Sequence, residues 1–294
     1  MKYLFLVFFL VICNEVFADA DGLNHKDSTN HAVADTDTVL RKRSISIGAN
    51  YGSDVLFFGR TGPIKYPFAS TDVVYNSKTG FFIYGSAVQV IGYSPIVDEV
   101  DLGAGYLFNY SKKASGTISY SRFIFGDNAV LVIKSASSND IDFKNSFDWK
   151  FAKSSVITDY LFGKSSDFFL TLNTSKYIET NFNIFDDKDY LSFNPTISAI
   201  FGTQNFVQKF SIDHRYRLDL DNIYAPGGGE PPSFLYDNGK FNILNYNFKL
   251  PIAYNRPHYT FEATWKYSIP VNVEGALKNR HEVFFNLTFF YLFF

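Results

Sequence analysis

Apolar and polar residues alternate along most of the chain beyond residue 43, which is the pattern of β-strands that have one apolar face. In the clearest run, 99–110, acidic, glycine and amide residues dominate one parity, and the other parity carries Val100, Leu102, Ala104, Tyr106, Phe108 and Tyr110. Turn-forming residues separate the runs. Further strands are predicted at 44–51, 69–75, 81–91, 116–125, 129–135, 141–151, 156–162, 168–173, 177–185, 190–201, 206–218, 241–250, 258–269 and 283–294.

The final run, 283–294, is rich in aromatic residues and ends on Phe294. Chain ends are normally polar, so this run requires an apolar environment. A bilayer provides one, because a tilted transmembrane strand needs only about 9–11 residues, whereas a helix needs about 20. The parity from Val283 to Phe293 is apolar throughout and is predicted to face lipid. The other parity is predicted to turn inward beside the first strand, with Glu282, Asn286 and Thr288.

The runs together predict an all-β protein, a transmembrane antiparallel up-and-down β-barrel. Closed single-chain barrels have even strand numbers, and short neighbouring runs can belong to one bent strand, so about 12 strands are expected, with about 10 or 14 as alternatives. The competing fold is a secreted β-sandwich or a soluble barrel, which would bury mainly Val, Ile and Leu. A helical fold is disfavoured because no run keeps apolar residues at helical spacing for three turns.

The N-terminal segment, 1–20, has the pattern of a secretory signal peptide: a basic start, an apolar run and small residues at the cleavage site. The polar segment 21–43 is expected to be a disordered lead-in, and 44–294 is expected to form the barrel. Cys13, the only cysteine, lies at the apolar run, but Ile12 before it does not suit a lipid-modification site. Ordinary cleavage would therefore leave a mature chain without disulfides.

Composition favours the same class. Aromatic residues make up 19% of the chain, with 34 Phe, 20 Tyr and 1 Met, and the formal net charge is −2. A membrane barrel places aromatic residues toward lipid and polar residues in its lumen, which averages to a near-neutral hydropathy, and the mean hydropathy is −0.06. No basic stripe is present that would neutralise phosphates, so a nucleic-acid partner is not expected.

The signal peptide, polar lead-in, succession of aromatic-rich strands and terminal Phe294 together resemble an outer-membrane β-barrel protein of Gram-negative bacteria. The composition is similar to that of uncharacterised barrels of the Bacteroidetes type. The resemblance implies export to the outer membrane and recognition of the last strand by the barrel-assembly machinery. The residues that would carry this assembly signal are Phe289, Tyr291, Phe293 and Phe294. One departure is that the continuous apolar parity ends at Phe293, which leaves Phe294 out of phase.

Charged residues within the predicted strands should point into the lumen or lie near the rims, because Arg or Lys facing lipid at the midplane costs about 2–4 kcal/mol. Asp148 and Lys150 are further inward candidates, whereas Arg122 shares the lipid-facing parity and would have to reach the rim. The cluster around His214 is interpreted as structural lumen charge, with a selectivity constriction or catalysis as alternatives. The candidate lumen charges are Glu99, Asp101, Asp213, Arg215, Arg217, Glu262, Lys266 and Glu282.

Motifs for catalysis or for cofactors are not evident. The five histidines are scattered, and HExxH, paired cysteines and phosphate-binding loops are absent from the sequence. We therefore expect neither an enzyme nor a bound cofactor or metal. The Gly- and Pro-rich segment from Asp221 to Lys240 is expected to be a long extracellular loop without a ligand.

Two function classes remain from this sequence. The first is a pore or channel for small solutes, which Gly103 and Gly105 favour because inward glycines would leave space in the lumen. The second is a non-conducting structural or surface-binding barrel with a plugged lumen, and an outer-membrane enzyme comes third. The expected partners are outer-membrane lipids, the assembly machinery and small solutes, and the default oligomeric state is a monomer.

Overall fold

The regular structure in the described part of the chain consists of β-strands. The computed structural model describes residues 43–55, 65–92, 96–126, 137–203, 241–272 and 281–293. Within those ranges no helix is long and apolar enough to cross a membrane. The expected signal peptide and lead-in, the strands at 129–135 and 206–218 and the loop from Asp221 to Lys240 lie outside the described residues, as does Phe294.

The strand bounds are close to those expected from the alternation for most of the chain. The strands are β1 (Ser44–Gly52), β2 (Phe68–Asn76), β3 (Phe81–Val90), β4 (Glu99–Asn109), β5 (Ala114–Phe125), β6 (Ser137–Asp148), β7 (Lys153–Gly163), β8 (Ser166–Ser175), β9 (Ile178–Glu179), β10 (Tyr190–Phe193), β11 (Thr196–Gly202), β12 (Asn242–Asn255), β13 (Tyr259–Pro270) and β14 (Glu282–Phe293).

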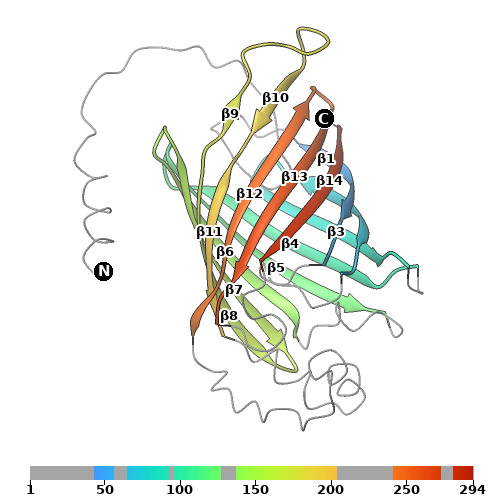
Figure 1. Cartoon of the computed structure of the whole chain (residues 1–294), viewed down its shortest axis with the longest axis vertical. Helices are drawn as coiled ribbons and strands as arrows, with labels where there is room; N and C mark the ends of the chain where they lie inside the picture. The colour runs from blue at the N-terminus through green and yellow to red at the C-terminus, as the bar shows by residue number, and fades with distance from the viewer. Residues whose placement is uncertain are drawn as a thin grey trace, which may run out of the picture.

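Twelve of these strands close into an antiparallel up-and-down barrel (Figure 1). Each strand from β1 to β8 pairs with the next, β8 pairs with β11, β11 with β12, β12 with β13 and β13 with β14. The ring is completed by β14 and β1, in a register that places Phe293 opposite Ile45 and Asn286 opposite Gly52. The predicted fold and the preferred strand number are therefore confirmed, and β9 and β10 stand outside the closed wall.

The two ends of the barrel differ in the length of their connections. We call the end where β1 begins and β14 finishes the terminal end. It carries the short connections 77–80, 110–113, 149–152 and 256–258. The opposite end, the loop end, carries longer ones that include 53–67 and 203–241. There are two exceptions. The connection 164–165 at the loop end has two residues, and 176–195 is a long connection at the terminal end that contains β9 and β10 and rises above the rim in Figure 1.

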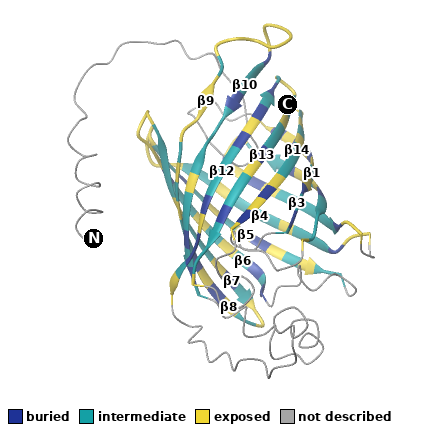
Figure 2. Ribbon diagram, viewed as in Figure 1, coloured by how far each residue is buried: buried dark blue, intermediate teal, exposed yellow. Residues whose placement is uncertain are grey.

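Buried and exposed positions alternate along the wall strands, as Figure 2 shows. In β1, for example, Ile45 and Ile47 are exposed on the outer face and Ser44 and Ser46 are buried on the inner face. Among the described residues, many more large apolar side chains are exposed than buried. The outer face is therefore a continuous apolar surface, and the inner face is predominantly polar.

The last strand has the orientation that its alternation predicts. Val283, Phe285, Phe289, Tyr291 and Phe293 are exposed on the outer face of β14, and the other parity faces the lumen. Thr288 donates a hydrogen bond to Asn50 of β1, which fixes the closing seam from inside. The predicted outward and inward parities are thus confirmed. The role of this strand in assembly stays a prediction.

Two sequence predictions fail between β8 and β12. The strand expected at 177–185 is wrong, because regular pairing there is limited to the two residues of β9. The strand expected at 190–201 is divided at Asn194 and Pro195, since proline has no N–H to donate to a ladder. The two parts pair with different stretches of one long strand: β11 with Asn242–Lys249 of β12, and β10 with Ile252–Asn255.

Candidate functional site

The candidate site is the barrel lumen, whose wall carries two separate groups of charged residues. The acidic group comes from β2, β4, β6 and β7. Asp142 of β6 and Asp159 of β7 are directly opposite each other in the strand register, and Ser119 of β5 donates a hydrogen bond of 3.5 Å to Asp142. The members of the acidic group are Asp72, Glu99, Asp101, Asp140, Asp142 and Asp159.

The basic group lies on β6, β7, β12 and β13. Lys144, Lys153 and Lys249 line one cavity of 220 Å³, which we call the basic chamber. The other seven residues that line it are serines, asparagines and a threonine, among them Ser146 and Asn173. Lys266 of β13 is the direct register partner of Lys249 and extends the group along the wall.

The basic chamber occupies the half of the lumen nearest the terminal end. Lys144 and Ser146 lie in the last part of β6, Lys153 begins β7, and Thr196 begins β11. The register brings these positions together because β6, β7, β8, β11 and β12 are consecutive in the sheet. Residues that are about a hundred positions apart in sequence, such as Lys144 and Lys249, therefore reach the same cavity.

Five of the sequence-predicted lumen charges have inward positions in the wall. Glu99 and Asp101 belong to the acidic group, and Glu282 is buried at the start of β14. Glu262 accepts a hydrogen bond of 2.6 Å from Thr264 on the same face of β13, and Lys266 faces the lumen two residues farther on. Whether these charges act on a solute stays a prediction. The other three candidates lie outside the described residues: Asp213, Arg215 and Arg217.

Asp148 and Lys150 lie at the rim, the second of the two positions expected for charges within strands. Both are exposed at the terminal end, where Lys150 lies in the β6–β7 turn with a φ of 72°. The amide N of Lys150 donates a hydrogen bond of 2.7 Å to Asp148 Oδ1, which closes a local turn. Asp148 is the last residue of β6, and the alternation of inward and outward residues ends there because 149–152 form a turn.

Sequence reasoning missed all three lysines of the basic chamber and four of the six residues of the acidic group. The signal was present in β6, where Asp140, Asp142 and Lys144 alternate with the exposed Ile141 and Phe143. The same reasoning that selected Glu99 applies to these residues. The contribution of β12 was harder to foresee, because it depends on which strands become neighbours after the long connection 203–241.

The expectation that Gly103 and Gly105 open space in the lumen is also wrong. A Cβ at Gly103 would lie 2.3 Å from the ring of Tyr84, and one at Gly105 would lie 2.4 Å from the ring of Phe82. Aromatic side chains of β3 thus lie flat over the glycines of β4. Gly48 and Phe290 form the same arrangement across the β1–β14 seam. These glycines allow close packing of inward rings.

Arg122 has the outward orientation that its parity predicted. It is exposed near the loop end of β5, and its Nη1 donates a hydrogen bond of 2.8 Å to Oδ1 of Asn139. The hydroxyl of Tyr120 donates to the same oxygen at 2.8 Å. The guanidinium is therefore held at the rim by polar partners, as a long cationic side chain on an apolar surface should be.

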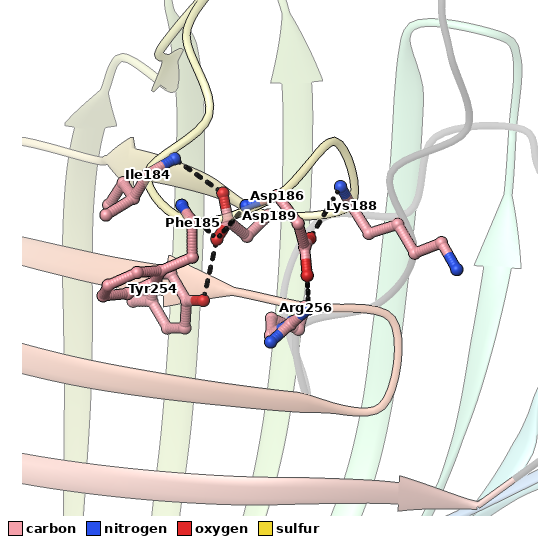
Figure 3. Close-up of polar contacts among 7 residues, drawn as sticks. All are labelled: Ile184, Phe185, Asp186, Lys188, Asp189, Tyr254 and Arg256. Carbon is pink, nitrogen blue, oxygen red and sulfur yellow. Dashed lines mark hydrogen bonds and ion pairs between the residues drawn. The ribbon is translucent and has the colours of Figure 1, made fainter.

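The rim of the lumen beside the basic chamber is built by the connection 176–195, which we call the bracket (Figure 3). Asp189 is buried at its base and accepts hydrogen bonds from the amides of Ile184 and Phe185 at 2.7 and 2.9 Å. The hydroxyl of Tyr254, at the end of β12, donates to Asp189 at 2.9 Å. Asp186 forms an ion pair with Arg256 in the β12–β13 turn. The bracket is thus tied to β12 by polar side chains.

Hydrogen bonding sets the charge state of Asp189. Burial acts to raise the pKa of this carboxyl group, but the amide donors of Ile184 and Phe185 and the hydroxyl of Tyr254 outweigh burial, and the pKa lies below its ordinary value. Because the folded-state pKa is lower than the unfolded-state value of about 3.9, the carboxylate stabilises the bracket fully above that value. The stabilisation is lost as the pH falls through the lowered pKa.

We therefore expect Asp189→Asn to loosen the bracket and leave the barrel closed. An asparagine side chain has one carbonyl oxygen in place of two carboxylate oxygens, so the amide donors lose an acceptor. Amide exchange in 178–193 of the detergent-refolded protein should become about tenfold faster or more at pH 7. In the wild type we expect the exchange rate of these amides to rise steeply once the pH falls below the ordinary aspartate range. The variant should not show this rise. Unchanged exchange in the variant would contradict this role, and Asp187→Asn in the same exposed turn is the control.

Comparisons with known proteins find similarity to solved structures only, at low sequence identity. No protein-family profile and no curated protein sequence matches it. Solved structures do match. The structure described as KdgM porin has 8% identity and a TM-score of 0.45, over 85% of this chain and 99% of that one. The NanC porin structure has 11% identity and a TM-score of 0.44, over 84% and 98%. An outer membrane channel from Pseudomonas putida F1 has 10% identity and a TM-score of 0.43, over 88% and 100%.

Proposed function

We propose that this protein is an integral outer-membrane β-barrel that conducts small solutes. The outer surface supports the membrane location, because side chains such as Ile47, Leu102 and Phe261 are exposed all around the wall. Soluble proteins seldom expose apolar patches larger than a few hundred Å². A closed barrel satisfies its backbone hydrogen bonds internally, which is what the interior of a bilayer requires.

The orientation follows from the connections. Outer-membrane barrels have short turns on the periplasmic side and longer loops outside. By this rule the terminal end faces the periplasm and the loop end faces the exterior. The connection 203–241, which includes the segment from Asp221 to Lys240, would then be extracellular. The bracket and the basic chamber would lie at the periplasmic end.

The observation that carries the pore function is the polarity of the inner face. A barrel of this strand number that had only to be stable could fill its interior with apolar side chains, as the cluster Leu161, Phe169 and Leu244 does locally. Most of the remaining wall presents hydroxyl, amide, carboxylate and ammonium groups instead. Rings of charged side chains are the means by which channels select solutes.

The alternative is a plugged barrel that does not conduct. It is favoured by the same apolar cluster at the loop end and by the aromatic rings packed over Gly103 and Gly105. Both features narrow the interior. Conductance separates the two functions, because a plugged barrel inserts into a bilayer without carrying current.

We expect discrete conductance steps when the refolded protein is added to a planar bilayer. Ser119→Trp, which places a large ring on the inner face beside Gly105, should reduce the step size, whereas Ile118→Trp on the outer face should leave it unchanged. Folding of each variant is checked by heat-modifiable migration on a gel. A folded wild-type barrel that gives no current above background would contradict the pore. A chain that is soluble without detergent would contradict the membrane location.

A further inference from the structure

We propose that the basic chamber is a binding site for a small anion that also carries hydroxyl groups, such as a sugar acid or a sugar phosphate. This inference rests on the proposed pore function and adds to it a solute class and a place in the lumen. Three observations support it: the convergence of lysines, the cost of that convergence, and the chemistry of the rest of the lining.

The lysines converge from separate strands. Lys144 and Lys153 come from β6 and β7, and Lys249 comes from β12, across β8 and β11 in the sheet order. Lys249 lies between Phe248 and Leu250, and Lys144 follows the exposed Phe143, so the pleat directs both side chains toward the lumen. The three side chains bound one cavity of 220 Å³. An anion in this cavity would be within reach of ammonium groups from both sides.

The arrangement is unfavourable for an empty barrel. Lys249 has Lys266 directly opposite on β13 and Thr196 directly opposite on β11. Like charges in opposed positions destabilise a sheet, and partial burial increases the cost because the ammonium groups lose water. None of the ten residues that line the chamber is a carboxylate, although the acidic group, Glu262 and Glu282 face the lumen elsewhere. A bound anion would offset the repulsion between the converging lysines.

The other lining residues indicate that the anion carries hydroxyl groups. Serine, threonine and asparagine side chains, such as Ser155, Ser198 and Asn173, can both donate and accept hydrogen bonds. The chamber lining contains no aromatic or aliphatic side chain on which an apolar ligand could pack. Its volume is below the range of about 300–1,000 Å³ that is usual for drug-sized ligands. A single hydroxylated ring or short open chain would fit these properties.

The test is a binding measurement that does not depend on conductance. Gluconate and glucose 6-phosphate are titrated calorimetrically into the full-length barrel refolded in detergent, with uncharged sorbitol as the matched hydroxylated probe. We expect saturable binding of at least one anion and none of sorbitol. The double variant Lys144→Gln, Lys249→Gln should weaken anion binding by about tenfold or more, since each lost charge-assisted hydrogen bond is worth at least that factor. Lys112→Gln, Lys113→Gln, in an exposed turn, is the charge-matched control and should bind as the wild type does.

The possible outcomes test the anion-binding site and the pore function separately. Binding of neither anion to a folded wild-type barrel would overturn the binding site whether or not the barrel conducts. Equal loss of binding in the chamber variant and the turn variant would also overturn it, because net charge alone would then explain the effect. Binding with no current in a bilayer would retain the site and refute the pore. Where both hold, added gluconate should block the wild-type current and should not block the current of the chamber variant.

Discussion

Replacing Gly105 by alanine is expected to destabilise the barrel by about 3 kcal/mol. An added Cβ would lie 2.4 Å from the Phe82 ring and 2.6 Å from the backbone oxygen of Ile118 on the adjacent strand. The Phe82 ring is buried, and the backbone of one strand in a closed wall cannot move without its neighbours. Moving either the ring or the Ile118 oxygen would therefore cost free energy. Gly85→Ala is the matched control, because its Cβ would have ordinary contacts at 3.5 and 3.8 Å, and its effect should stay within about 0.5 kcal/mol.

The two inward glycines of β4 should respond differently to removal of the covering ring. The three nearest atoms to a Cβ at Gly103 all belong to Tyr84, so Tyr84→Ala should remove most of the penalty of Gly103→Ala. At Gly105 the backbone oxygen of Ile118 remains, so Phe82→Ala should rescue Gly105→Ala only in part. Urea unfolding in lipid vesicles, arranged as two double-mutant cycles, measures both couplings. Equal rescue in the two cycles would refute the backbone contact as a cause.

Leu287→Arg is expected to cost about 2–4 kcal/mol of folding free energy in a bilayer. Leu287 lies at the middle of β14 on the outward parity, between the exposed Phe285 and Phe289. A guanidinium there would enter the hydrocarbon at a depth from which its side chain cannot easily reach water. Thr260 and Asn286 are on the inward parity, and the same charge on that side of the wall would face the polar lumen.

Asn286→Arg is therefore the control, with the same charge one residue away on β14. It should fold with a loss well below that of the outward variant in the same vesicle-unfolding measurement. A comparable loss in the two variants would mean that the outer face of β14 does not meet lipid. Shorter-chain lipids should reduce the cost of Leu287→Arg, since a thinner bilayer brings the guanidinium closer to water.

The orientation of most wall residues could be predicted from the sequence because a strand repeats every two residues, and that property is local. Ile45, Leu102 and Phe293 were assigned to the outer face by counting alone, and the structure agrees. The same alternation places Arg122 on the otherwise apolar outer face. Its hydrogen bond to Asn139 explains how a charged side chain is tolerated there. The alternation does not apply at Lys150, because this residue lies in a turn and not in a strand.

The cavity and the bracket could not be predicted in this way, because both depend on which strands become neighbours. Lys144 and Lys249 share a cavity only because β11 closes the gap between β8 and β12 in one particular register. The break at Pro195 is visible in the sequence, but nothing local indicates that β10 then pairs with the far end of β12. The filled space over Gly103 and Gly105 likewise depends on side chains of a neighbouring strand.

The long strand β12 would otherwise present an open edge at the terminal end of the barrel. β11 pairs with β12 only as far as Lys249, so the backbone groups of Ile252–Asn255 need another partner. β10 pairs with the backbone of Ile252–Asn255, and β9 pairs with the other side of β10. The free edge is then formed by β9, which is only two residues long. Unpaired edges recruit strands from other chains, and a very short edge strand offers too little length for that pairing. The bracket that Asp189 stabilises would thus limit edge-to-edge aggregation of the barrel.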